Sequence, residues 1–188
     1  MSRSSGGSLG VSTGSLDPAL RKRIGRAARR RAARRFLVVL GVTALATYLL
    51  FGVLFGVALV EGSSMEPAYQ DGDLVLFSRM DGAYAAGDVV LVGNGFRTDL
   101  IKRVIATPGQ DVDLKGGFVL VDGMPLVESY AVGVTEAKQA VSLPLSLAED
   151  EYFVLGDSRD RSRDSRSFGP VERSRIDGKV VAVLRLGG

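Results

Sequence analysis

The sequence has no histidine, no cysteine and no tryptophan among its 188 residues. Without imidazole or thiol groups, the chain cannot assemble a Ser-His-Asp triad, a cysteine nucleophile or a zinc site with His and Cys ligands. Catalysis would therefore have to use serine, threonine, tyrosine, lysine or carboxylate groups. The absence of cysteine also excludes disulfides, so it leaves the redox compartment open.

Charge is distributed unevenly along the chain. Residues 1–35 contain 10 of the 24 Lys and Arg residues and one acid, Asp17, whereas the remainder contains 14 basic and 20 acidic residues. Such a basic cluster is typical of a nucleic-acid-binding arm or of the cytoplasmic flank of a membrane segment. Half of the first 20 residues are Ser or Gly, which is too little apolar surface to offset the entropy of ordering. We therefore predict a disordered basic cytoplasmic tail over residues 1–35.

A long apolar segment follows the basic cluster. Residues 36–60 include no charged side chain in 25 positions, and about 20 such residues suffice to span a bilayer. The segment predicts a single transmembrane helix, with a cleaved signal peptide or a buried helix as alternatives. A signal peptide normally has an apolar stretch of only about 7–15 residues. Because positive flanks stay in the cytoplasm, residues 61–188 are expected to lie outside it.

The remainder of the chain predicts an antiparallel β domain. Its apolar runs are short, rich in Val, Leu and Phe, and separated by Gly-Asp or Asp-Gly pairs, which is typical of strands and turns. The pair Asp122-Gly123 predicts a two-residue hairpin turn, and Pro125 predicts that the strand after it lies at an edge. A small accessory β region is expected at about residues 112–151. The expected strands are Leu74–Ser78, Asp88–Val92, Leu100–Ala106, Phe118–Val121, Tyr152–Gly156 and Lys179–Leu186.

Three stretches have a composition that packing alone does not explain. Ser64 lies in a turn directly after the apolar segment, where serine usually serves only as a turn residue. Lys102 lies inside an apolar strand, and alternation places it opposite Ile101 and Arg103, so a solvated lysine on the outer face is the ordinary explanation. Residues 156–169 contain four Arg, three Asp and four Ser. They form either a solvated loop, an RNA-binding Arg-Ser segment or a fixed scaffold of ion pairs.

Taken together, these stretches suggest a serine nucleophile activated by a neutral lysine. Lys102 would have to lose its proton near neutral pH, as a lysine does when it is desolvated or lies beside another cation. Ile101, Val104 and Ile105 could supply the desolvation, and Arg103 the second positive charge. The useful pKa would be about 7–8. The sequence leaves open whether Lys102 is buried.

Over residues 36–188, the order of motifs resembles that of the type I signal peptidases, membrane-bound serine proteases that remove signal peptides from exported preproteins. After the apolar segment come Ser-Met-x-Pro, Gly-Asp-Val-Val, Lys-Arg-Val-Ile-x-x-Pro-Gly and Gly-Asp-x-Arg-x-x-Ser-x-Asp-Ser-Arg-x-x-Gly. Each motif alone is weak, but four in order behind an anchor are specific. The resemblance implies a mainly β fold, with an antiparallel β-sheet catalytic domain of signal-peptidase type behind one N-terminal transmembrane α-helix.

The resemblance also implies roles for individual residues. Ser64 would be the nucleophile and Lys102 the general base that later protonates the leaving amine. Ser162 would form a hydrogen bond with Lys102 and orient it. Asp164 and Arg166 would form a structural ion pair that holds the loop of the last motif, with Asp157 and Arg159 in supporting positions.

The oxyanion hole and the substrate pockets are less fully specified. The backbone N–H of Ser64 would stabilise the tetrahedral intermediate. Some family members add a hydroxyl two residues earlier, where this chain has Gly62, so a side-chain donor is missing. The substrate would bind as an added strand, with small side chains of an Ala-x-Ala sequence in shallow pockets. Val60, Met65 and Ile101 are candidates for lining these pockets, although core packing would also account for them.

The expected partners are preprotein signal peptides and a bilayer with anionic headgroups at the basic flank, with an indirect link to the protein export machinery. No nucleic acid, metal, nucleotide or organic cofactor is expected. The protein would be a single-pass plasma membrane protein with a cytoplasmic N-terminus. One alternative is a non-catalytic, membrane-anchored homologue that binds signal peptides, because Gly62 weakens the oxyanion site. Another is a self-cleaving Ser-Lys repressor, which would require a DNA-binding module where this chain has an anchor.

Overall fold

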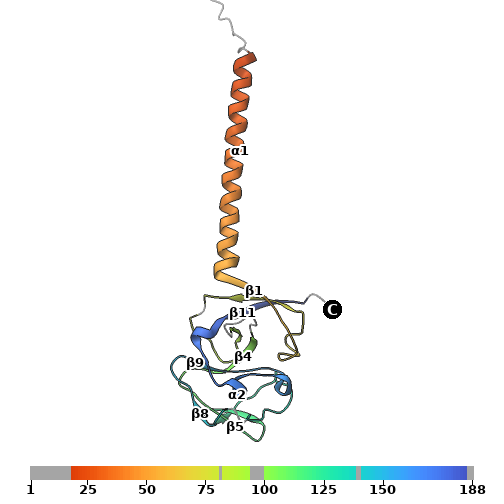
Figure 1. The fold of residues 1–188 in the computed structure, drawn as a ribbon, viewed down its shortest axis with the longest axis vertical. Helices are drawn as coiled ribbons and strands as arrows, with labels where there is room; N and C mark the ends of the chain where they lie inside the picture. Colours follow the sequence, from red (N-terminus) through yellow and green to blue (C-terminus); the bar gives the residue numbers. More distant parts are fainter. Residues whose placement is uncertain (1–17, 81, 94–99, 139–140, 186–188) are drawn as a thin grey trace, which may run out of the picture. The chain divides into compact units, whose positions relative to one another are not determined.

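The computed structural model describes residues 18–80, 82–93, 100–138 and 141–185 (Figure 1). The chain divides into two compact units, Met1–Thr47 and Tyr48–Gly188. The first unit contains the long helix α1, and the second contains two β-sheets. Each unit is described separately below.

Helix α1 covers Pro18–Tyr48. Residues 1–17 of the expected disordered tail lie outside the described residues, but the prediction is wrong from Pro18 onward, where the basic segment is helical. Ala and Arg dominate this part of the sequence, and both are strong helix formers. Among the described residues, one helical stretch, Arg29–Leu54, is long and apolar enough to cross a membrane.

The apolar run does not remain helical to residue 60. A π-helical turn, η1, covers Leu49–Leu54, and Phe55–Leu59 then forms strand β1. Strand β1 pairs antiparallel with β2, Leu74–Ser78, so that Gly56 lies opposite Phe77. An added Cβ on Gly56 would lie 2.2 Å from the Phe77 ring. The helical part is therefore shorter than expected, because pairing with β2 satisfies the backbone of the last apolar residues in a sheet.

The larger sheet has seven strands in the order β1-β2-β11-β3-β4-β9-β10, and all its pairings are antiparallel. Strand β4 lies inside this sheet, between β3 and β9. Most residues of this strand are buried, so the strand can carry a buried site. The further strands are β3, Val89–Val92; β4, Leu100–Ala106; β9, Glu151–Leu155; β10, Val171–Glu172; and β11, Ile176–Leu184.

The smaller sheet has the order β7-β6-β5-β8. The expected hairpin forms around Asp122 and Gly123, whose φ angles are 52° and 77°, as a tight two-residue turn requires. Pro125 lies on β7, at the edge of the sheet, as predicted. The strands are β5, Asp111–Lys115; β6, Phe118–Val121; β7, Met124–Pro125; and β8, Leu145–Ser146.

The mainly antiparallel β fold class is confirmed. Strands β2, β4 and β6 have the bounds expected from the sequence, and β3, β9 and β11 differ from expectation only at their ends. Strands β1, β5, β8 and β10 were not expected. The short helical elements of the second unit are η2, Arg159–Arg161; α2, Ser165–Phe168; and η3, Arg173–Arg175.

Candidate active site

Ser64 lies in the turn that follows β1. The buried side chain of Met65 anchors this turn in a core cluster that also contains Val60 and Ile101. From the opposite side, the backbone N–H of Ser158 donates a hydrogen bond of 3.0 Å to the carbonyl oxygen of Ser64. The turn is thus held both by the apolar core and by the loop after β9.

Lys102 lies on β4 with its side chain turned inward. The residue is 2% exposed, so the ordinary explanation of a solvated lysine is wrong. Its Nζ donates hydrogen bonds to Ser64 Oγ at 2.8 Å and to the carbonyl oxygen of Ile101 at 2.7 Å. The two candidate catalytic residues, 38 positions apart in the sequence, are in direct contact.

Burial lowers the pKa of Lys102 from 10.5 to about 8, although the carboxylates of Asp164 and Asp157 raise it in part. The loss of solvation of the charged ammonium is the dominant physical cause. Arg103 does not supply the expected second positive charge, because its Nε and Nη2 donate to Asp157 at 2.8 and 2.6 Å and the carboxylate compensates it. The proximity of an amine of lowered pKa to a hydroxyl is the arrangement that can activate a serine.

The loop after β9 is a buried scaffold of ion pairs. Arg166 donates to both carboxylate oxygens of Asp164 at 2.8 Å, and the two side chains are 2% and 0% exposed. Arg166 also donates to the carbonyl oxygen of Arg159 at 2.7 Å, while Gly156 N–H donates to Asp164 at 3.1 Å. Burial raises the pKa of Asp164, but the bonds and charge of Arg166 outweigh it and leave the pKa lowered. This burial contradicts both the solvated-loop and the RNA-binding interpretations of the segment.

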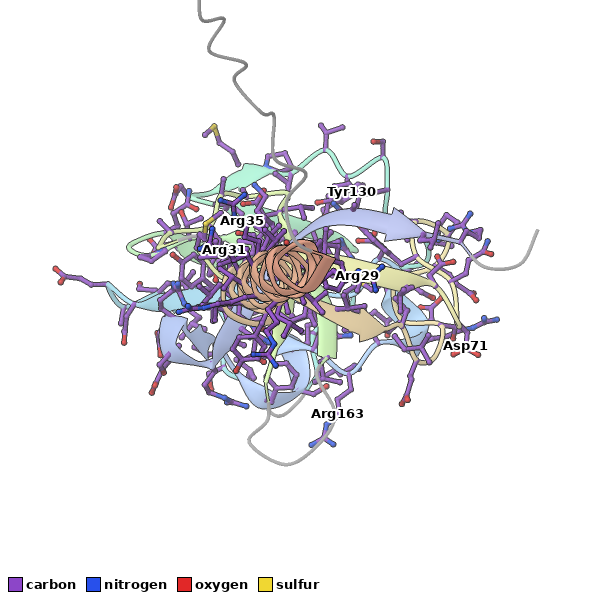
Figure 2. The ribbon with its side chains drawn as sticks, turned by 90° about the horizontal axis from the view of Figure 1, so that it is seen from above. Arg29, Arg31, Arg35, Asp71, Tyr130 and Arg163 are labelled. Atoms are coloured by element: carbon purple, nitrogen blue, oxygen red, sulfur yellow. The ribbon has the colours of Figure 1, made fainter. Side chains whose placement is uncertain are left out.

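The other arginines of the same loop differ from one another in exposure. Arg163, between buried Ser162 and Asp164, is exposed and extends outward from the periphery of the second unit (Figure 2). Arg159 is 1% exposed, pairs with Glu128 at 2.5 Å and also donates to Thr135. Most residues of this motif are therefore buried, whereas Asp160, Arg161 and Arg163 are exposed.

The geometry around Ser162 differs from the expected one. Its Oγ is buried and makes no hydrogen bond of ordinary geometry among the described residues, although its interaction with the Asp164 carboxylate helps to lower the pKa of that carboxyl. Instead of the expected bond to Ser162, Nζ of Lys102 makes bonds to Ser64 and to the Ile101 carbonyl. Ser162 instead packs against Gly156, where an added Cβ would lie 2.3 Å from Oγ. Its carbonyl oxygen accepts a bond of 2.7 Å from Lys138.

The backbone amides of Gly62 and Ser64 are the candidate oxyanion donors. The N–H of Gly62 already donates to the Asp71 carboxylate at 2.7 Å, and Gly62 has a φ of 81° that favours glycine. The N–H of Ser64 has no acceptor among the described residues. In the described residues, no group of three or more acidic side chains is placed to hold a metal ion.

A small cavity adjoins Ser64 and Lys102. Its volume is about 40 Å³, which is room for two or three waters or one small side chain. Val60 and Ile101 contribute to its wall and also pack in the core, whereas Met65 belongs to the core alone. The remaining wall is formed by Ala58, Leu59, Glu61, Val75, Leu91 and Leu100.

Several residues around the site were not found by sequence reasoning. Glu128, Tyr130, Thr135 and Lys138 all come from the segment between β7 and β8. They contact Arg159, Arg103 and Ser162. No local pattern identifies them, because their partners lie in distant motifs.

Comparison with known proteins matches the sequence of this chain to a known family. The family model for signal peptidase, peptidase S26, matches residues 33–185. A signal peptidase I of Bacillus licheniformis is 32% identical over 137 residues, covering 66% of this chain and 74% of that protein. A signal peptidase I of Bacillus amyloliquefaciens is 35% identical, with 66% and 71% covered.

Among solved structures, a signal peptidase I from Enterococcus faecalis is 27% identical and covers 52% of this chain and 97% of that one, with a TM-score of 0.44. The family is one of serine endopeptidases. The chain belongs to the signal peptidase family, peptidase S26, of the type I class.

Proposed function

We propose that this protein is a membrane-anchored serine endopeptidase that removes N-terminal signal peptides from exported preproteins after an Ala-x-Ala sequence. The observation that carries the proposal is the 2.8 Å contact between Lys102 Nζ and Ser64 Oγ, with the lysine buried. The family and its signal peptidase I relatives support the same assignment.

In the proposed mechanism, neutral Lys102 takes the proton of Ser64 as Oγ attacks the scissile carbonyl carbon. The resulting oxyanion accepts a hydrogen bond from the N–H of Ser64. Lys102 then gives its proton to the leaving amine as the C–N bond breaks, which leaves an acyl-enzyme. Lys102 next takes a proton from a water molecule, whose oxygen attacks the acyl carbon, and it returns that proton to Ser64 Oγ as the acyl C–O bond breaks and the signal peptide is released.

The cavity volume supports a preference for small residues. A substrate that adds as a strand places alternate side chains on the same side, and the cavity of about 40 Å³ accommodates a methyl group next to Ser64. A larger side chain would have to displace Val60 or Ile101, which are 3% and 7% exposed in the core. This is the physical basis for expecting alanine before the scissile bond.

The pH dependence of cleavage tests the proposal directly. Because the base must be neutral and its pKa is lowered to about 8, kcat/KM should rise with pH and reach half its maximum near 8. The measurement is cleavage of an Ala-x-Ala preprotein in detergent between about pH 6 and 10, with a preprotein carrying leucine at the last position as the uncleaved control. A flat profile, or equal cleavage of both substrates, would contradict it.

We propose that the protein crosses the membrane once, with its basic segment in the cytoplasm. The apolar helix ends at Leu54, and Arg29, Arg30, Arg31, Arg34 and Arg35 precede its uncharged part. Positive residues remain on the cytoplasmic side and attract anionic headgroups. The catalytic unit would lie outside the cytoplasm, where it meets exported preproteins and depends only indirectly on the export machinery.

Replacing all nine Lys and Arg residues between Arg21 and Arg35 by glutamine should weaken or invert insertion, because the charge that sets the orientation is then removed. A protease-protection assay on intact cells reports which side the second unit occupies. Arg163→Gln, at an exposed position of the second unit, is the control that leaves the flank unchanged. Wild-type orientation of the nine-fold variant would argue against the predicted topology.

A second candidate function follows from Gly62, which offers no side-chain donor and whose N–H is engaged with Asp71. A weak oxyanion site would favour a non-catalytic protein that binds signal peptides. A folded wild type that binds a signal peptide without cleaving it would support this candidate over the peptidase.

A further inference from the structure

An aromatic ring covers the ion pair beside the candidate base. Arg103 follows Lys102 on β4, donates to Asp157 through Nε and Nη2, and donates to the Gly87 carbonyl at 2.8 Å. Its guanidinium lies 4.2 Å from the ring centroid of Tyr130, within the range of a cation–π contact. Tyr130 is labelled in Figure 2 and comes from the segment between β7 and β8. The ring therefore stacks on a pair that is 13% and 1% exposed.

The contacts continue from Tyr130 to the loop after β9. The Tyr130 hydroxyl donates to Glu128 at 3.0 Å, and Glu128 accepts from Arg159 at 2.5 and 2.8 Å. Arg159 Nε then donates to the Gly156 carbonyl at 3.1 Å. Gly156 lies against the nucleophile turn, since an added Cβ would be 2.5 Å from the Ser64 carbonyl oxygen. A continuous set of contacts thus joins Arg103, which follows the candidate base, to Gly156, whose backbone lies against the turn of Ser64.

We infer that Tyr130 and Glu128 are positioning residues, which hold the Arg103–Asp157 pair beside Lys102 and the Gly156 backbone beside Ser64. The inference rests on the proposed function of the Ser64–Lys102 pair. Neither residue belongs to the motifs that identify the family, and neither contacts the reacting atoms. They act through Arg103 and Arg159.

Loss of the Tyr130 ring should raise the pKa of Lys102. The Asp157 carboxylate raises the pKa of Lys102, and Arg103 compensates that charge. Removing the ring loosens Arg103 and admits water, and both effects favour the protonated lysine. Tyr130 itself does not titrate in the working range, because burial and the Glu128 carboxylate raise its pKa. The charged or titratable groups packed around this region are Glu61, Tyr69, Arg103, Glu128, Lys138, Asp157, Arg159, Asp164 and Arg166.

The test compares Tyr130→Leu, which removes the ring, with Tyr130→Phe, which keeps it. In Tyr130→Leu the pH at which kcat/KM is half its maximum should rise by at least about half a unit. At pH 7 this rise lowers kcat/KM by about threefold or more. Tyr130→Phe should stay within about twofold of the wild type, because stacking on Arg103 is retained. Phe118→Leu makes the matched change at a position that is 62% exposed and should move nothing.

An acidic limb of Tyr130→Leu that coincides with those of the wild type and Phe118→Leu would overturn the inference. If Tyr130→Leu unfolds at the assay temperature, Glu128→Asp replaces it. That variant keeps the charge opposite Arg159 but shortens its reach, and the same upward movement is expected. An inactive wild type contradicts the proposed function itself, whereas an active wild type with unmoved variants contradicts this inference alone.

Discussion

Replacing Lys102 by methionine should abolish cleavage while raising the melting temperature of the protein. Cleavage should fall by about 10⁴-fold or more, as when a nucleophile or its base is removed from a serine protease. Ser64→Ala should lose as much activity. The double variant should be no worse than either single variant, because both residues serve one proton transfer.

The rise in stability has a separate cause. A lysine whose pKa falls from 10.5 to about 8 on folding costs about 3 kcal/mol when it is charged in both states. Methionine avoids this cost, so we expect a net gain of about 1–3 kcal/mol at pH 7 after the loss of two hydrogen bonds. The unfolded state binds more protons between the two pKa values, so the wild type gains stability as pH rises from 8 to 10.5. The advantage of the variant should disappear over that interval.

The measurements are cleavage of the Ala-x-Ala preprotein and thermal unfolding at two pH values. Lys115→Met is the matched control, since the Lys115 side chain is 73% exposed, and it should change neither activity nor melting temperature. Cleavage by Lys102→Met at the wild-type rate would remove Lys102 from the mechanism. A lower melting temperature at pH 7 would contradict the burial of a charged lysine.

Asp164→Ala should cause a large loss of stability. The change leaves Arg166, 2% exposed, without its carboxylate, and breaking one side of a buried ion pair costs about 3–5 kcal/mol. The expected fall in melting temperature is about 10 °C. Because the pKa of Asp164 is lower in the folded chain than its ordinary value of 3.8, the wild type loses this contribution only as pH falls below that value, and the variant has none to lose.

The control for this prediction is Glu66→Gln, which breaks the exposed contact of 3.5 Å with Arg161. An exposed pair contributes only about 0–1 kcal/mol, so little change is expected. Arg166→Met in the Asp164→Ala background should recover part of the loss, because no buried charge then remains. Equal effects of Asp164→Ala and Glu66→Gln in thermal unfolding would show that the ion pair is not a structural element.

Sequence reasoning succeeded where information is local. Strands β2, β4 and β6 have apolar runs bounded by turn residues, and their bounds were predicted correctly. Strand β1 was missed because its residues continue an apolar run, and only pairing with β2 distinguishes them from helix. The charge of Arg103 was likewise misinterpreted, because its partner, Asp157, is 54 positions away.

By itself, the sequence determined the family, the candidate nucleophile and base, and the mainly β class, because motif order and short-range periodicity are properties of the linear chain. Only the tertiary structure decided that Lys102 is buried and touches Ser64, that Ser162 does not bond to Lys102, and that Tyr130 covers Arg103. The pKa of a lysine depends on what excludes water from it. In this protein the groups that do so come from segments brought together only by the pairing of distant strands.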